Sequence, residues 1–350
     1  MRNEKTENTK VSLGWLIIAL LALLAFFSAV GKAQSVRKIE SVGFTVSDMD
    51  RAIDFYTRVL GLRLVKVTVN FDDPNAYHFY YGDTSGAPGT ILTFFVWPMG
   101  HRVRVGRGGV SATAFSVPLD SLDWWRERLE REGIQIGEFS PRFGEKGLAF
   151  SDPDGMILEL IETPAPAIAN VWKGATIPEK AAIWGFHGVS IFANGIEPTA
   201  NVLTETLGFE KIGIENGRAR FGGKSEIGRF VDVIFAPELP RAGQGTGAVH
   251  HIAFRAQDDD SQLRFRAELV RGGANVSPVM ERDYFRSIYF REPGGVLFEI
   301  ATDAPGFAID EPLENLGGAL QLPAQFRAHR EKIEANLPRV VLPNGGEIGV

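Results

Sequence analysis

The hydrophobic and polar positions of this chain follow one pattern that occurs four times. Each occurrence has an alternating strand, a helix with apolar residues at i, i+3 and i+4 spacing, and further strands joined by Gly and Asp-Pro turns. The segment DSLDWWRERLEREG shows the helix clearly, with Asp120 or Ser121 as N-cap and Gly133 as the stop. We therefore predict four βαβββ units and an α+β fold.

Internal repeats arrange these units in two tandem halves. The helix exits Leu60-Gly61 and Leu207-Gly208 lie 147 positions apart. Glu159 and Glu299 lie 140 positions apart, and the Gly-containing turns that precede them have the same offset. Each unit covers one face of its sheet with a helix and leaves the other open. Pairs of units should therefore combine their open faces into cup-shaped mixed sheets, and a ligand can occupy such a cup.

The repeat boundaries divide the chain into parts. We expect a first domain over residues 38–163, a second over 183–303 and a C-terminal extension over 304–350. The first 33 residues differ, because MRNEKTENTK precedes the apolar run VSLGWLIIALLALLAFFSAV. This arrangement is typical of a secretory signal cleaved after Ala33, and the run is also long enough for a membrane anchor of about 20 residues. A buried core helix is the alternative.

These two interpretations of the N-terminal segment predict an exported protein, periplasmic or extracellular, or one tethered to the membrane. With 350 residues, 44% of them apolar, the chain can bury substantial cores. A net charge of -6 argues against a nucleic-acid binder and favours a small-molecule or protein partner. The chain has no cysteine, which excludes disulfides and thiolate metal ligands.

The order of the units resembles a known superfamily. Four tandem βαβββ units are similar to the vicinal-oxygen-chelate superfamily, which has the fold of glyoxalases and extradiol dioxygenases. The segments VNFDDPNAYHFYYGDTSGAPGTILTFFVWP, VHHIAFRA and ERDYFRSIYFREPGGVLFEIATDAPGF resemble the hydroquinone-type ring-cleaving dioxygenases, over roughly residues 38–340. The resemblance implies a hydroquinone or catechol and dioxygen as reactants. It also implies Fe(II), or Mn(II), held by two His and one carboxylate.

Two of those three ligands can be assigned. His251 lies in the first strand of the fourth unit and Glu299 in its last strand, and these strands should be neighbours. Because side chains alternate along a strand, His250 and His251 are expected to face opposite sides. The family pattern places the ligand directly before Ile-Ala-Phe, which selects His251 and leaves His250 as a packing or supporting residue of the catalytic set. A cup-lining His251 without metal is the alternative.

The third ligand position holds a serine. The resemblance places this ligand in the first strand of the first unit, where the chain has Ser41, and a neutral hydroxyl is a weak Fe(II) ligand. Glu40 could replace it only if the strand slipped by one residue, which would invert its buried face. His78 is interpreted as a supporting or core residue, and His101 would need a loop movement. Water at this position would leave a weaker site.

The resemblance assigns two further residues to substrate handling. The Tyr289 phenol can donate a hydrogen bond to a substrate oxygen, and the Arg282 guanidinium can favour a phenolate. The alternatives are a half-buried strand aromatic and a surface charge. Glu159 has Ala112 at the matching histidine position, so we interpret it as a vestige or a polar strand end, and His187 as structural.

The sequence therefore predicts a protein similar to non-haem Fe(II) ring-cleaving dioxygenases, with weak or lost activity because Ser41 lowers the metal affinity. The alternative from another class is a non-catalytic binding protein for small aromatic molecules, of the glyoxalase/bleomycin-resistance type. A lyase or isomerase of the glyoxalase type is a further option, but it ordinarily needs more ligands than His251 and Glu299.

Overall fold

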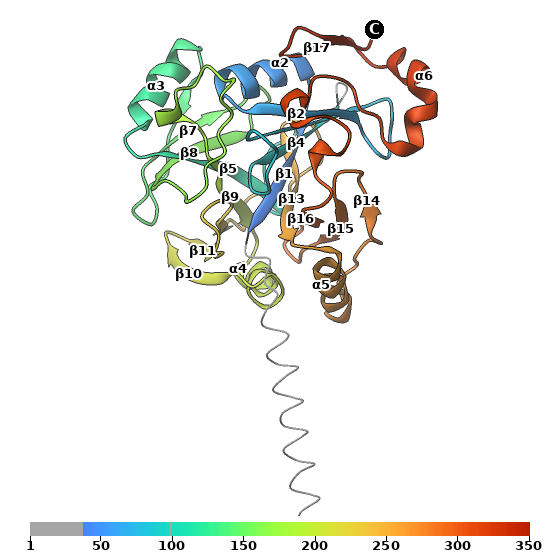
Figure 1. Cartoon of the computed structure of the whole chain (residues 1–350). Helices are drawn as coiled ribbons and strands as arrows, with labels where there is room; N and C mark the ends of the chain where they lie inside the picture. Colours follow the sequence, from blue (N-terminus) through green and yellow to red (C-terminus); the bar gives the residue numbers. More distant parts are fainter. Residues whose placement is uncertain (1–37, 98–99) are drawn as a thin grey trace, which may run out of the picture. The chain divides into compact units, whose positions relative to one another are not determined.

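Strand pairing joins units that are distant in the sequence. The computed structural model describes residues 38–97 and 100–350. The first and fourth units share one eight-stranded sheet, and the second and third units share another. In Figure 1 the blue strand β1 of the first unit lies beside the orange strand β13 of the fourth. The predicted α+β fold of four βαβββ units with cup-shaped mixed sheets is confirmed.

Each unit has the same order of elements. The first contains β1 (Ile39–Val46), α2 (Met49–Ile53) with a π-helical continuation (Asp54–Val59), β2 (Arg63–Val69), β3 (Tyr77–Gly82) and β4 (Ile91–Val96). The second contains β5 (Gly109–Pro118), α3 (Leu122–Arg131), β6 (Ile136–Gly137), β7 (Gly147–Ser151) and β8 (Ile157–Thr163). The third contains β9 (Gly185–Ala193), α4 (Ile196–Asn201) with its π-helical continuation (Val202–Thr206), β10 (Glu210–Glu215), β11 (Arg218–Gly222) and β12 (Phe230–Phe235). The fourth contains β13 (Ala248–Ala256), α5 (Asp259–Arg271), β14 (Met280–Glu281), β15 (Arg286–Arg291) and β16 (Leu297–Thr302).

The first strands of paired units form the centre of each sheet. The order is β14-β15-β16-β13-β1-β4-β3-β2 in one sheet and β10-β11-β12-β9-β5-β8-β7-β6 in the other. The central pairs β1–β13 and β5–β9 are antiparallel. Apolar helix residues such as Met49 and Trp125 are buried in the core. The helices therefore cover one face of each sheet.

The first strand of each unit carries one extra residue relative to the strand with which it pairs. In β1–β13 the register shifts between Ile39 and Ser41, which leaves Glu40 extra, and again opposite Gly43, which leaves His250 extra. In β5–β9 the corresponding extra residues are Ser111 and His187. These shifts have the pattern of β-bulges, in which two consecutive residues oppose one partner residue. The bulges occupy equivalent positions in all four units.

The C-terminal extension packs against the first sheet. Lys66 on β2 is fully buried and forms ion pairs with Asp310, at 2.5 Å, and with Glu311. Its ammonium group lies 4.9 Å from the centre of the Tyr284 ring. Phe307 packs on Tyr284 with ring centres 5.3 Å apart. The extension also contains α6 (Arg330–Glu334) and the small strands β17 (Val340–Val341) and β18 (Glu347–Ile348).

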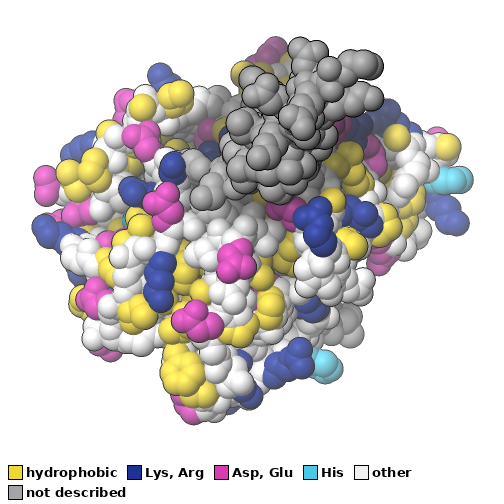
Figure 2. Space-filling model, turned by 90° about the horizontal axis from the view of Figure 1, so that it is seen from below, with side chains coloured by type: hydrophobic (Ala, Val, Ile, Leu, Met, Phe, Trp, Pro, Cys, Tyr) yellow, Lys and Arg dark blue, Asp and Glu magenta, His cyan; other side chains and the backbone are white. Residues whose placement is uncertain are grey.

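Charges of both signs lie close together on the surface. Figure 2 shows one face of the molecule, where Lys and Arg side chains alternate with Asp and Glu side chains and apolar groups. In residues 38–97 and 100–350, no helix has the length and apolar character needed to cross a membrane. The predicted signal or anchor concerns residues 1–33, which lie outside the described residues.

The buried Lys66 provides a test of how the extension is held. The variant Lys66→Ala leaves the carboxylates of Asp310 and Glu311 without their buried cation, so the free energy of unfolding should fall by about 3 kcal/mol. Urea denaturation of the purified protein measures this change. Lys332→Ala, at an exposed position of α6, is the matched control and should change stability by less than about 0.5 kcal/mol. Equal stability of the two variants would contradict a structural role for the buried ion pairs.

Candidate active site

A cavity of about 240 Å³ opens into the cup of the first sheet. It contains all six residues that the sequence assigned to the site: Ser41, His250, His251, Arg282, Tyr289 and Glu299. The rest of the wall is mainly aromatic and polar, and consists of Asn70, Phe71, Asp72, His78, Tyr80, Thr93, Phe95, Trp97, Phe285 and Leu297. Residues from the first and fourth units therefore meet in one cavity.

His251 and Glu299 are in direct polar contact in the cavity. His251 Nε2 lies 3.0 Å from Glu299 Oε2, and both residues are buried, with 3% and 2% exposure. Ser287 donates a hydrogen bond to the other carboxylate oxygen of Glu299. Burial raises the pKa of Glu299, but His251 and hydrogen bonds from Ser287 and Tyr289 outweigh it and hold the pKa below its ordinary value. Glu299 is therefore an ionised carboxylate directed at an imidazole.

The imidazole of His251 lies against the backbone of β1 because position 43 has no side chain. Gly43 pairs with His251 across the β1–β13 junction. A Cβ atom added at Gly43 would lie 2.1 Å from His251 Cε1, which is far inside van der Waals contact. Glycine at this position thus leaves the space that the His251 ring occupies beside Glu299.

The expectation that His250 and His251 face opposite sides is wrong. Both line the cavity, and their Nδ1 atoms lie 3.0 Å apart. The reason is the bulge, because both residues oppose Gly43 and regular alternation is lost at this point. Burial, followed by the neighbouring His251, lowers the pKa of His250 to about 3. His250 is thus a neutral imidazole beside His251.

Ser41 lies in the cavity at the level of Glu299. It pairs with Ala253 on β13, and Ala253 pairs with Glu299 on β16, so the three residues form one row across three adjacent strands. In the part of the chain that the structure describes, no group of three or more His, Cys, Asp or Glu side chains is placed to hold a metal ion. The cavity therefore offers a metal ion the His251 imidazole and the Glu299 carboxylate, together with the neutral hydroxyl of Ser41.

Glu40 is the extra residue of the β1 bulge, and the strand does not slip as a whole. Val42 and Phe44 remain in the core while Ser41 lines the cavity. Glu40 is 2% exposed, and its Oε2 has no hydrogen-bond partner among the described residues. Burial raises the pKa of Glu40 to about 8, opposed by a hydrogen bond with Ser41 and reinforced by the charge of Glu299. Glu40 is thus a buried carboxyl that favours its protonated form.

The other two histidines considered from the sequence have different surroundings. His78 lines the cavity, where it contacts Thr93 Oγ1 and the Tyr80 hydroxyl and stacks on Phe95 with ring centres 4.2 Å apart. Burial lowers its pKa well below the ordinary value, and the charges of His251 and Arg282 act in the same direction. His101 is exposed and is not part of the cavity wall.

Arg282 and Tyr289 face each other inside the cavity. Tyr289 on β15 pairs with Glu299, and burial raises the pKa of its phenol, so the hydroxyl stays protonated. The Arg282 side chain is only 14% exposed, and its guanidinium lies 5.7 Å from the Tyr289 ring centre. It also pairs with Asp72 at 3.2 Å. The Tyr289 hydroxyl therefore lies between the Glu299 carboxylate, to which it donates, and the Arg282 cation.

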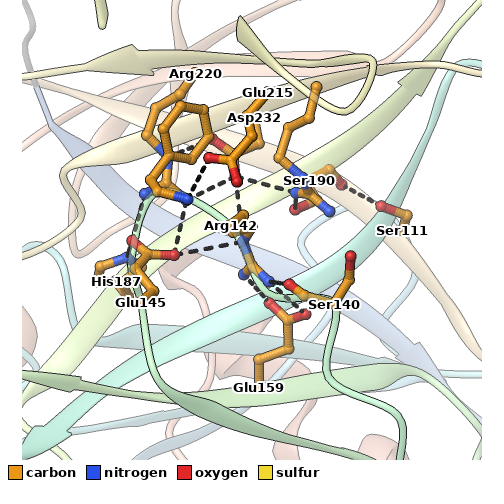
Figure 3. A network of polar contacts seen from close by, with 12 residues as sticks. Ser111, Ser140, Arg142, Glu145, Glu159, His187, Ser190, Glu215, Arg220 and Asp232 are labelled. Atoms are coloured by element: carbon orange, nitrogen blue, oxygen red, sulfur yellow. Dashed lines mark hydrogen bonds and ion pairs between the residues drawn. The ribbon is translucent and has the colours of Figure 1, made fainter. Parts of the chain in front are cut away.

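The equivalent position of the second sheet holds an ion-pair network instead (Figure 3). Glu159 accepts hydrogen bonds from Arg142, at 3.2 Å to Nη1. His187 Nε2 lies 2.7 Å from a carboxylate oxygen of Glu145. Arg142 also reaches toward Asp232 at 3.6 Å. These contacts pair Glu159 and His187 with charged partners in the second cup, where a cavity of about 320 Å³ remains beside Glu159.

Sequence reasoning missed several residues of the cavity. The strand YHFYYG places His78 and Tyr80 two positions apart, so period-two alternation was a usable signal for Tyr80. The same alternation in ILTFFV links Thr93 and Phe95. Gly43 gave no signal, because its contribution is the absence of a side chain next to a ring from a strand 200 residues away.

Comparison with known proteins agrees with this fold and cavity. A family model described as the Glyoxalase/Bleomycin resistance protein/Dioxygenase superfamily matches residues 38–160 and 185–300. The chain belongs to this superfamily.

Relatives within the superfamily are named as dioxygenases. "Putative ring-cleaving dioxygenase MhqO" of Bacillus subtilis (strain 168) is 41% identical over 305 residues, which cover 87% of this chain and 97% of the relative. Chlorohydroquinone/hydroquinone 1,2-dioxygenase of Sphingobium indicum is 34% identical over 290 residues, covering 80% of this chain and 89% of the relative. A crystal structure of a "putative dioxygenase" from Bacillus subtilis subsp. subtilis str. 168 superimposes with a TM-score of 0.84 at 41% identity, covering 88% of this chain and 98% of that one. The resemblance to ring-cleaving dioxygenases is confirmed.

The pKa of Glu40 predicts a pH dependence of stability. An unfolded Glu loses its proton near 4.5, whereas the folded carboxyl keeps it up to about 8. The folded state therefore binds more protons in this range, and the free energy of unfolding should fall as pH rises from 4.5 to 8, by an amount on the order of a few kcal/mol. Glu40→Gln should flatten this fall in urea denaturation curves recorded at several pH values. Glu331→Gln, at an exposed position, is the control, and an unchanged slope in Glu40→Gln would contradict the assignment.

Gly43 provides a steric test of the site. Gly43→Ala should displace the His251 ring from Glu299 and lower the free energy of unfolding by about 1–3 kcal/mol. Gly137→Ala is the matched control, because its Cβ would meet only the Ala149 carbonyl oxygen at 3.6 Å. Urea denaturation together with a crystal structure of each variant would show the effect. A Gly43→Ala protein that keeps the 3.0 Å contact between His251 and Glu299 at full stability would refute the steric argument.

Proposed function

We propose that this protein is a ring-cleaving dioxygenase for hydroquinone- or catechol-type aromatics, with a metal centre weakened by Ser41. The observation that carries the proposal is one cavity in which His251, Glu299 and Tyr289 meet. Relatives named for ring cleavage, at 34–41% identity over most of the chain, support the reaction class. The reactants are a small aromatic diol and dioxygen.

The residues of the cavity fit a metal only in part. His251 and Glu299 supply an imidazole and a carboxylate, which are donors that Fe(II) or Mn(II) accepts. Ser41 stands where the family resemblance places a second imidazole, and a neutral hydroxyl does not replace it. The described residues therefore offer two strong donors in place of three, and the affinity for Fe(II) should be correspondingly low.

The remaining cavity residues suit an aromatic diol. Phe95, Trp97 and Tyr80 provide faces against which a ring can pack, and the cavity volume of about 240 Å³ suits a single ring. The Arg282 guanidinium favours the ionised phenolate form of a bound diol. The protonated Tyr289, which donates to Glu299 in the structure, can redirect that hydrogen bond to a ring oxygen when the diol enters. These two groups would orient the diol whether or not it is cleaved.

A second candidate function is binding of a small aromatic molecule without chemistry. The number of metal donors in the cavity favours this binding function, because the described residues contain no group of three metal-binding side chains. The two functions differ in metal content, since an enzyme should hold metal in proportion to chain and a binding protein should not.

We propose that residues 1–33 direct export or form a membrane tether, on the basis of the apolar run and its flanks. N-terminal sequencing of protein from fractionated cells would separate cleavage from retention. Full-length protein in the soluble cytosolic fraction would contradict both.

The variant Ser41→His tests the proposed metal centre. It restores the imidazole that the resemblance places at position 41, so the affinity for Fe(II) should rise by on the order of tenfold or more. Anaerobic Fe(II) titration measures the affinity, and hydroquinone-dependent oxygen uptake measures the activity, which should increase with it.

Two control proteins make this result specific. His251→Ala in the Ser41→His background should abolish the gain, because two strong donors would again remain. Gln135→His adds an imidazole at an exposed position of the second unit and should leave Fe(II) affinity unchanged. Wild-type protein that binds stoichiometric Fe(II) and cleaves hydroquinone as fast as Ser41→His would show that another residue completes the site.

A further inference from the structure

A second cavity of about 230 Å³ adjoins the candidate active site. The two cavities share Trp97, His250 and Leu297 in their walls. The His250 ring lies 5.1 Å from the Phe95 ring and 6.4 Å from the Trp97 ring, measured between centres. The two cavities are therefore neighbours with a partly common wall.

The wall of the second cavity is strongly basic. Four of its residues are arginines: Arg104, Arg107, Arg241 and Arg291. Its described lining contains no Asp or Glu. None of the four arginines takes part in an ion pair within the described residues, whereas arginines elsewhere in the protein do, such as Arg142, Arg220 and Arg255. The cavity thus concentrates positive charge that the described protein does not neutralise.

The wall is built from two chain segments that link consecutive units. Arg107 donates its backbone N–H to the Pro240 carbonyl at 2.8 Å, and Ala242 donates to the Arg107 carbonyl at 2.9 Å. A Cβ atom on Gly106 would lie 2.3 Å from the Pro240 carbonyl oxygen, so the two backbones approach as closely as glycine allows.

Side-chain contacts hold two of the guanidinium groups in place. Arg107 Nε donates to the Leu239 carbonyl at 2.5 Å, and Arg291 Nη1 donates to the Gly295 carbonyl at 3.0 Å. Each guanidinium keeps further N–H groups for a ligand, because arginine has five donors. The arginines therefore line the cavity from the paired backbone segments and from β15, with Arg107 partly buried and the other three exposed.

We infer that this second cavity binds the carboxylate group of an aromatic-sized organic acid, a step that rests on the proposed function of the adjoining site. Guanidinium groups match carboxylates in shape and charge, and such hydrogen bonds are stronger than those between neutral groups. A neutral hydroquinone gives these arginines no anionic partner. The carboxylate belongs either to the substrate, as an aromatic diol acid, or to the acidic product of ring opening.

Binding to the metal-free protein under anaerobic conditions tests the inference without any turnover. Isothermal titration calorimetry should show that benzoate binds at least about tenfold more tightly than benzyl alcohol, which lacks the charge. The double variant Arg241→Gln/Arg291→Gln should lose this preference. Arg126→Gln/Arg131→Gln, which removes the same two charges from exposed positions of α3, should keep it. Equal binding of benzoate and benzyl alcohol, or a preference that survives in the double variant, would overturn the inference.

Two further ligands distinguish the source of the carboxylate. Tighter binding of 2,5-dihydroxybenzoate than of hydroquinone, lost in the double variant, would assign the carboxylate to the substrate. Binding of cis,cis-muconate that depends on the arginines, without that preference among the diols, would assign it to the product. The inference would also be overturned if 2,5-dihydroxybenzoate bound no more tightly than hydroquinone and if the binding of cis,cis-muconate did not depend on the arginines. A protein that binds these acids but consumes no oxygen after Fe(II) reconstitution would contradict the proposed function alone.

Discussion

The junction between β1 and β13 is the contact on which the candidate site depends. It joins the first and fourth units, which are separated by about 200 positions in sequence, and so creates a cavity that neither unit has alone. At the centre of the junction Gly43 opposes His251, and the missing side chain leaves room for the imidazole beside Glu299. A change in this register would separate Ser41 from the row that it forms with Glu299.

The bulges on the first strand of each unit explain how the two sheets share one architecture but carry different polar side chains. Each bulge interrupts side-chain alternation at the same point of the repeat, and in β13 it brings His250 and His251 into one cavity. In the second sheet the same point carries His187, which contacts Glu145 in a network of ion pairs. Glu40, at the β1 bulge, forms no ion pair among the described residues, and it favours its neutral form. The fold therefore brings the side chains at equivalent positions of the units together. Their identity determines whether they form a set of metal donors or a network of ion pairs.

The repeat offsets and periodicity were sufficient to predict the four βαβββ units. Periodicity also brought His251 and Glu299 together, whereas Tyr289 and Arg282 came from the family resemblance, and all four line the cavity. Alternation failed at His250, because a bulge depends on pairing with a distant strand that periodicity within one strand does not report. The arginine-lined cavity was equally inaccessible. Its wall comes from two segments between units, and only their backbone hydrogen bonds bring them together.

The metal content of the wild-type protein tests the central claim most directly, namely that this cavity holds two strong metal donors in place of three. Purified protein would be reconstituted anaerobically with Fe(II), passed through a desalting column and assayed for bound iron per chain. A site limited to His251 and Glu299 predicts well under one Fe(II) per chain after this step. One tightly retained Fe(II) per chain, lost on replacing His251 with Ala, would contradict the claim and show that the cavity has a complete ligand set.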